Sequence, residues 1–142
     1  MFTNILVAID GSDISMLGLN RAITLAKQDS AKLHIIYVID TRDTGNGPMD
    51  ATGELIHERF LTEGKQALDA AKKLADEAGI DYEVHMETGS AGDTIVKTAE
   101  KQQCDLIVLG SLSKSKINRL ILGSIASYVL NTAKTNIMIV RK

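Results

Sequence analysis

Five short runs of apolar residues are spaced along this chain, and between them lie longer segments in which apolar residues recur every three or four positions. Four of the runs are nearly continuous, as in strands buried on both faces: residues 5–9, 33–39, 106–109 and 137–140. Residues 82–86 instead alternate apolar and polar side chains, which indicates a strand near a sheet edge. The pattern predicts five strands separated by four helices.

Polar residues that can cap a helix stand at three of the predicted helix starts. Ser12 or Asp13 precedes the first helical segment, and Ser90 and Asp93 are spaced as a capping box. Ser124 stands directly before another apolar segment, where a serine can cap free backbone N–H groups. Each of these positions therefore predicts a helix start.

One segment of the chain predicts a long loop. Residues 40–53 hold three glycines and the sole proline, so they could fold over a site at the strand ends or simply face solvent. Apolar residues at helical spacing then run from Phe60 to Ala78, and Gly79 can end that helix.

Strands that alternate with helices build a parallel sheet, because the crossovers between parallel strands are almost always right-handed. We therefore predict a single domain over residues 1–142 with a three-layer α/β fold of the flavodoxin/Rossmann type, a five-stranded parallel sheet with helices on both faces. In this winding the first strand lies beside the fourth in sequence. Ligands bind at the carboxyl ends of such strands, here Asp10 to Ser12 and Gly110 to Ser113.

The segment 105–130 combines a buried strand, a polar loop and a helix start. Gly110 and Gly123 allow the backbone to approach a ligand closely, and the helix N-terminus favours an anion. The residues between them supply hydroxyls and positive charge: Ser111, Lys114, Ser115, Lys116 and Arg119. The pattern indicates a phosphate site, although a solvated loop capped by a serine would carry the same residues.

This loop resembles the nucleotide-binding signature of the universal stress protein family: glycine, two residues, glycine, nine residues, glycine, then serine or threonine. Gly110, Gly123 and Ser124 match the signature, whereas Ser113 stands where the family has its second glycine. The resemblance extends from NILVAIDGS at residues 4–12 to IMIVRK at residues 137–142, so it covers the whole chain.

The resemblance implies an adenine nucleotide alpha hydrolase-like fold and an adenine nucleotide ligand, ATP, ADP or AMP, with Mg or Mn bound through the phosphates. It places Asp10 against the nucleoside and the backbone of Val38 at the adenine, although Asp10 could equally cap the next helix. Gly89 and Ala91 are expected near the ribose. The predicted nucleotide-binding residues are Ala8, Ile9, Asp10, Val38, Gly89, Gly110, Ser111, Ser113, Lys114, Ser115, Gly123, Ser124 and Ile125.

Ser113 is a departure from the family pattern. If its backbone must be left-handed, the serine costs about 1–2 kcal/mol, but its hydroxyl could still bond a phosphate. Because some family members bind ATP and others do not, the alternative is a member without nucleotide that acts as a dimeric interaction module. The resemblance also implies a homodimer, which the strand Ile137 to Val140 could form by pairing across a two-fold axis.

Composition narrows the classes of function. A net charge of −2 argues against general nucleic-acid binding. No apolar stretch approaches the ~18 residues of a membrane span and no leader is evident, so we expect a cytoplasmic protein in stress response or regulation. Cys104, the one cysteine, is predicted to be a small residue of the core. The histidines, His34, His57 and His85, are scattered without metal-ligand spacing, so we expect no metal site made of side chains.

The sequence also lacks recognisable catalytic machinery. It contains no serine, histidine and acid motif, no P-loop lysine and no obvious base to activate water, so we expect at most slow ATP hydrolysis and assign no catalytic residue. A phosphoacceptor signalling domain of similar winding would need an acidic pair after the first strand. No such pair follows Asp10, and Glu87 stands near the position of the acceptor aspartate.

Overall fold

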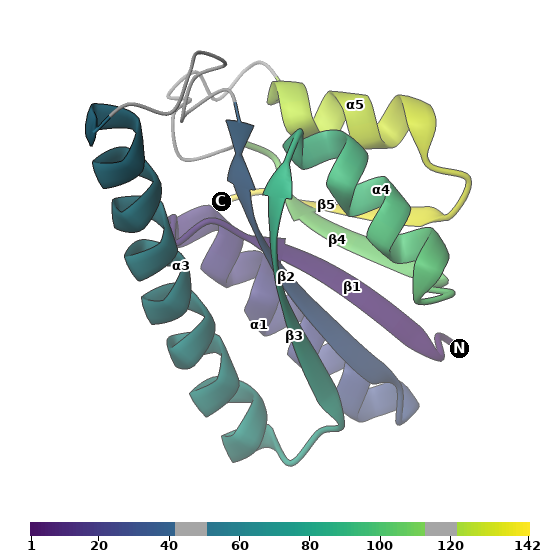
Figure 1. Ribbon diagram of the computed structural model, residues 1–142. Coiled ribbons are helices and arrows are strands. Elements are labelled where there is room, and N and C mark those ends of the chain that lie inside the picture. Colours follow the sequence, from purple (N-terminus) through teal and green to yellow (C-terminus); the bar gives the residue numbers. More distant parts are fainter. Residues whose placement is uncertain (42–50, 113–121) are drawn as a thin grey trace.

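The five predicted strands form one parallel sheet in the order β3-β2-β1-β4-β5 (Figure 1). The computed structural model describes residues 1–41, 51–112 and 122–142. The elements run along the chain as β1 (Asn4–Ile9), α1 (Asp13–Asp29), β2 (Lys32–Asp40), α3 (Ala51–Ala78), β3 (Tyr82–Gly89), α4 (Ala91–Lys101), β4 (Leu106–Gly110), α5 (Ser124–Thr132) and β5 (Asn136–Val140).

The strand order reverses its direction at β1. The chain first winds outward from β1 to β2 and β3, then crosses back so that β4 pairs with the other side of β1, with Ile5 opposite Leu106 and Val7 opposite Val108. The predicted neighbourhood of the first and fourth strands is therefore confirmed. The order 3-2-1-4-5 is that of the Rossmann half of the predicted class, and it opens a crevice between β1 and β4.

Helices cover both faces of the sheet, as the three-layer prediction requires. Figure 1 shows α1 and α3 on one face and α4 and α5 on the other. Each face has its own apolar core, because successive residues of a strand point to opposite sides. Val7 packs in the core beneath α1 and α3, whereas Leu6 and Ile36 pack in the core beneath α4 and α5.

The three predicted helix starts are confirmed, since Ser12 and Ser90 are the N-cap residues of α1 and α4 and α5 begins at Ser124, but a side-chain cap bond is present only at α1. Ser12 is the N-cap of α1, and its side chain accepts the Ser15 N–H at 3.3 Å. Ser90 precedes α4 but makes no side-chain cap bond. The capping box fails because Asp93 instead pairs with Lys97, whose Nζ lies 2.8 Å from its carboxylate.

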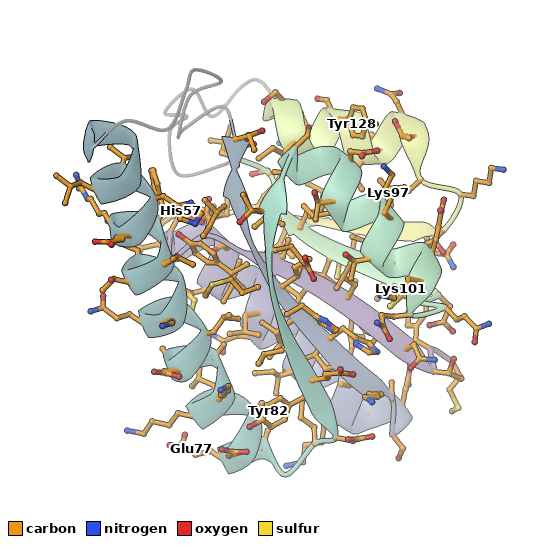
Figure 2. All side chains as sticks on the ribbon, viewed as in Figure 1. His57, Glu77, Tyr82, Lys97, Lys101 and Tyr128 are labelled. Carbon is orange, nitrogen blue, oxygen red and sulfur yellow. The ribbon has the colours of Figure 1, made fainter. Side chains whose placement is uncertain are left out.

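Helix α5 starts where predicted, but its capping residue differs from the prediction. Gly123 is the N-cap, without a side-chain bond, and Ser124 is the first helical residue and is exposed. Figure 2 shows Lys97 on α4 and Tyr128 on α5 facing the junction of the two helices. The Tyr128 hydroxyl donates to Asp93 at 3.4 Å, so this acid bridges α4 and α5 rather than capping α4.

Helix α3 begins at Ala51, nine residues before the periodic pattern that predicted it. The loop prediction is therefore wrong for residues 51–53, while residues 42–50 lie outside the part of the chain that the structure describes. The first turns of α3 were missed because the periodic apolar pattern was taken to begin at Phe60, and Leu55, which precedes it, is 67% exposed. The predicted end is confirmed, since Gly79 follows the helix with a φ of +69°.

The histidines are not scattered in space. His34 on β2 and His85 on β3 lie side by side, with Nδ1 of His34 3.0 Å from Nε2 of His85. Spacing along the sequence could not reveal this contact, because it depends on the pairing of two strands.

Cys104 is buried, in agreement with its predicted role as a small core residue. Burial, and secondarily the charge of Asp105, raises the pKa of the thiol to about 12.

Within the described ranges, none of the helices has both the length and the apolar character that a bilayer crossing requires.

Candidate functional site

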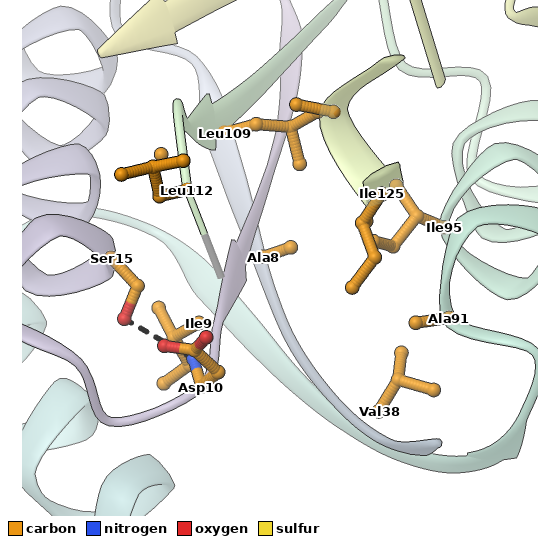
Figure 3. Close-up of a pocket in the computed structure, with 12 residues that line it drawn as sticks. Ala8, Ile9, Asp10, Ser15, Val38, Ala91, Ile95, Leu109, Leu112 and Ile125 are labelled. Atoms are coloured by element: carbon orange, nitrogen blue, oxygen red, sulfur yellow. Dashed lines mark hydrogen bonds between the residues drawn. The ribbon is translucent and has the colours of Figure 1, made fainter. Parts of the chain in front are cut away.

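A pocket opens at the carboxyl ends of β1 and β4, where the strand order reverses (Figure 3). Its walls come from β1, β2, β4 and the first turns of α1, α4 and α5, so segments far apart in the sequence converge there. The lining residues are Ala8, Ile9, Asp10, Ser15, Val38, Ala91, Ile95, Leu109, Gly110, Leu112, Ile125 and Ala126.

The polar side of the pocket is built on the turn from β1 to α1. The Asp10 N–H donates to the Ser15 hydroxyl at 3.2 Å, and the Asp10 carboxylate accepts the Ser12 N–H at 2.9 Å. The Ser15 hydroxyl in turn donates to the Ser12 carbonyl at 3.0 Å. Gly11, between these residues, has a φ of +84°, which glycine adopts without strain. These bonds hold the Asp10 carboxylate at the pocket wall.

The opposite side of the pocket is apolar. Figure 3 shows Val38 and Ala91 at one end of this wall and Ile95 and Ile125 at the other. The β1–β2 ladder ends at the pair of Ile9 and Tyr37, whereas β2 and β3 stay paired as far as Asp40 and Gly89. Val38 therefore begins a stretch of β2 that continues past the end of β1, with its backbone edge toward the pocket.

The end of β4 is tied to its neighbours on both sides. The Ser111 N–H donates to the Val140 carbonyl at 2.9 Å, and the Gly123 N–H donates to the Ser111 carbonyl at 2.8 Å. Gly110 packs closely on α1, since a Cβ at this position would lie 3.2 Å from Cγ2 of Ile14. The glycine thus lets α1 approach the strand at the pocket edge.

The structure brings together some of the residues predicted to bind nucleotide. Six of them line the pocket: Ala8, Ile9, Asp10, Val38, Gly110 and Ile125. Ser111, Gly123 and Ser124 adjoin the wall in sequence without lining it, and Gly89 lies at the end of β3 opposite Asp40. The predicted Ser113, Lys114 and Ser115 lie outside the described residues, as do Lys116 and Arg119.

Several lining residues were not predicted as site residues. These are Ser15, Ile95, Leu109, Leu112 and Ala126. Ser15 follows Ser12 by three residues, so one turn of α1 carries it back to the strand end, a spacing that could have identified it. Ile95 belongs to the core beneath α4, and only the packing of α4 over the sheet brings it to the pocket.

The described walls of the pocket carry a single charged group, Asp10. Apolar walls with one carboxylate and one hydroxyl are typical of a small-molecule site, in which a few polar groups fix the orientation of the ligand. None of the described lining residues is a histidine, cysteine, lysine or arginine. The described wall thus offers hydrogen-bond acceptors for a ligand and no set of groups for nucleophilic catalysis.

Comparison with known proteins gives one consistent result. A sequence model described as the universal stress protein family matches residues 1–141. Universal stress protein MJ0531 of Methanocaldococcus jannaschii is 36% identical over 142 residues, covering all of this chain and 84% of that protein. UspA of Lactobacillus plantarum superposes with a TM-score of 0.85 at 28% identity, covering 98% of this chain and 97% of that one. A universal stress protein in complex with cAMP superposes with a TM-score of 0.70 at 28% identity, covering 99% and 97% of the two chains.

Proposed function

Because the chain belongs to the universal stress protein family, we propose that it binds an adenine nucleotide in the pocket between β1 and β4. The ligand is ATP, ADP or AMP, and the protein acts in stress response or regulation in the cytoplasm, with residues 1–142 as a single universal stress protein domain. The observation that carries this proposal is that Asp10 and Gly110, predicted from distant parts of the sequence, line the same pocket at the reversal of strand order.

The nucleoside end of the ligand fits the described walls. In the proposed arrangement the adenine lies between Val38 and Ile125 and bonds the backbone of β2 where it continues past β1. The Asp10 carboxylate accepts from the amino group or a ribose hydroxyl. A carboxylate offers about four acceptor positions, so the bond from Ser12 leaves room for a ligand. The similar structure that holds cAMP supports an adenine ligand for this pocket shape.

The phosphate end would lie toward Gly110, Gly123 and the start of α5. A helix N-terminus favours an anion, and the intervening sequence carries Lys114, Lys116 and Arg119. These residues are proposed to supply the positive charge that the described walls lack. A Mg or Mn ion would be held through the phosphates rather than by side chains of the described wall.

Binding, rather than catalysis, is the proposed activity. Asp10 is the sole acid among the described lining residues, and no histidine or lysine lines that wall beside it to share in proton transfer. Any hydrolysis of ATP should therefore be slow.

We further propose that two chains associate through β5. This strand forms one edge of the sheet, and its apolar side chains, Ile137, Met138 and Ile139, are only half-buried within one chain. Edge strands of this kind pair readily with another chain. Sedimentation equilibrium should give twice the 15.3 kDa of one chain, and a single-chain mass would contradict the dimer.

Mass analysis of nucleotide released from purified protein tests the binding proposal, with calorimetric titration of ATP and magnesium into the emptied protein. A pocket-filling variant, Ala8→Leu, should abolish binding, because Ala8 is half-buried and lines the pocket. The matched control is Ala70→Leu at an exposed position on α3. Absence of extracted nucleotide together with absence of heat on titration would favour a family member that acts without nucleotide.

A further inference from the structure

A second cluster of polar side chains lies on the sheet, formed by His34 of β2 with Glu83 and His85 of β3. Nδ1 of His34 is 3.0 Å from Nε2 of His85 and 3.8 Å from Oε2 of Glu83, and the imidazole rings stack with centroids 5.2 Å apart. One donor atom from each residue lies within 4.8 Å of the other two. Within the ranges that the structure describes, this is the sole such group of three or more histidine, cysteine or acidic side chains.

The register of β2 and β3 creates this cluster. Glu83 pairs with His34, and His85 pairs with Ile36 two residues further along. Residues i and i+2 of a strand share a face, and diagonal neighbours on adjacent strands are within reach of long side chains. All three side chains therefore project from the same face, the one covered by α4 and α5, where Ile36 belongs to the core.

We propose that His34, Glu83 and His85 bind a divalent transition-metal ion of the zinc class, through Nδ1, Oε2 and Nε2 respectively. Imidazole nitrogen and carboxylate oxygen are ligands that zinc prefers, and two histidines with one glutamate leave a fourth position for water. In tetrahedral zinc with ligand bonds of about 2.0–2.1 Å, two ligand atoms lie about 3.3 Å apart. The His34 and His85 nitrogens share a hydrogen bond at 3.0 Å, so an ion would replace that bond and separate the two atoms by a few tenths of an ångström.

Burial and exposure are distributed as a bound ion requires. The His34 side chain is 3% exposed and fixed by its surroundings, whereas the Glu83 side chain is 49% exposed and gives an ion a path from solvent. Desolvation by burial, followed by the nearby His85, lowers the pKa of His34.

Lys32 is the local competitor of the ion. Its Nζ lies 3.4 Å from the Glu83 carboxylate. An exposed ion pair of this kind is weak, so a metal ion can displace it. Removal of the lysine charge should therefore strengthen metal binding, whereas a purely structural histidine pair would give no such response.

This site is separate from the proposed nucleotide pocket. Val38, which lines the pocket, follows His34 by four residues on β2, a distance of roughly 13 Å at 3.3 Å per residue. Metal binding here does not depend on nucleotide, so the two proposals can fail independently.

The test is calorimetric titration of zinc chloride into the full chain, free of nucleotide and of any histidine tag. One equivalent of zinc should bind, and cobalt(II) in its place should give visible absorption typical of a low-symmetry site. His85→Gln and Glu83→Gln should each weaken zinc binding by more than about tenfold. Loss of a residue that only hydrogen-bonds a metal ligand already costs about tenfold in affinity, and loss of a ligand itself should cost more. Lys32→Gln should tighten it.

The matched control is His57→Gln on α3, which packs on the opposite face of the sheet (Figure 2). This variant should bind zinc as the unmodified chain does. If His85→Gln fails to fold, the zinc affinity of Glu83→Gln decides the test. The Glu83 side chain is half-exposed, so this change should leave the fold intact. The proposal is overturned if the unmodified chain shows no saturable zinc binding, or if both ligand variants bind zinc as tightly as it does.

Discussion

The backbone N–H of Gly123 donates a hydrogen bond to the carbonyl oxygen of Ser111 at 2.8 Å. This bond joins the start of α5 to the end of β4, and the Ser111 N–H joins the same point to Val140 of β5. The two ends of the segment between Ser111 and Gly123 are therefore held together beside the pocket. Gly123 itself has a φ of −59°, a value open to any residue, so its backbone angle does not require glycine.

The first prediction follows from that backbone angle. Gly123→Ala should fold normally but bind adenine nucleotide at least about tenfold more weakly, or 1.4 kcal/mol, because a methyl group would stand where the phosphate approaches the N-terminus of α5. Calorimetry with ATP measures the affinity, and thermal unfolding measures the fold. If the affinity of this variant for ATP is unchanged, Gly123 does not contact the nucleotide.

Asp10 is predicted to act through its charge. Asp10→Asn keeps an oxygen that can accept the Ser12 N–H, so stability should change little, whereas nucleotide affinity should fall by about tenfold as a charge-assisted bond is lost. The matched control is Asp13→Asn, an exposed acid in the first turn of α1 that does not line the pocket. Equal affinities for the two variants would argue against contact between Asp10 and the ligand.

Two glycine-to-alanine changes inside helices should have opposite effects on stability. At Gly64 of α3 a Cβ would lie 2.9 Å from Cδ1 of the buried Tyr37 ring, so Gly64→Ala overpacks the contact with β2. Overpacking costs about 1–3 kcal/mol, more than the gain of about 1 kcal/mol in helix propensity. At Gly18 of α1 a Cβ would meet nothing closer than 3.8 Å, so Gly18→Ala should stabilise by up to about 1 kcal/mol.

Chemical denaturation of both glycine variants provides the measurement. A Gly64→Ala protein as stable as Gly18→Ala would mean that α3 can move away from the sheet without loss. Gly18→Ala also serves as a folding control for Gly123→Ala, since each change adds a single methyl group.

Asp105 is predicted to make the free energy of unfolding depend on pH in the acidic range. Its carboxylate accepts the Thr3 and Asn4 N–H groups at 3.0–3.1 Å and so ties the start of β4 to that of β1. Burial alone would raise the pKa of Asp105, but these hydrogen bonds lower it below its ordinary 3.8. The stabilisation is fully present above about pH 4 and is lost as the pH falls through the lowered pKa.

Asp105→Asn should therefore be less stable than the unmodified chain at pH 7, by about 1 kcal/mol, because solvent weakens exposed hydrogen bonds to a charged group. The difference between the two proteins should shrink below about pH 4, where the aspartate takes up a proton. Urea denaturation across this pH range makes the comparison. A difference that stays constant with pH would show that the carboxylate charge does not stabilise the fold.

Local patterns in the sequence predicted most of the architecture. The apolar runs located the strands, and the alternation of Tyr82, Val84 and Met86 identified β3 as an edge strand. The first turns of α3 were missed because the periodic apolar pattern was taken to begin at Phe60, after the exposed Leu55. Asp93 was misread because a carboxylate in the first turn of a helix can bond the N-cap or pair with Lys97 one turn later, and spacing does not decide between them.

The candidate site could be predicted only where a motif marked it. Asp10 and Gly110 end strands and were found, whereas Ser15 and Ile95 reach the pocket through the packing of α1 and α4. The contact between His34 and His85 joins residues 51 positions apart and depends on the register of β2 and β3. A slip of one residue would move His85 to the opposite face of the sheet. No spacing rule within a single segment contains that information.

The central claim is that an adenine nucleotide occupies the pocket between β1 and β4. Titration of isotope-labelled protein with ATP and magnesium, followed through its backbone amide NMR signals, tests this claim at the level of residues. We predict saturable shifts concentrated at Ala8 to Asp10, Val38, Gly110 to Leu112 and Ile125. Absence of shifts at saturating ATP, or shifts confined to residues away from these strand ends, would contradict the account.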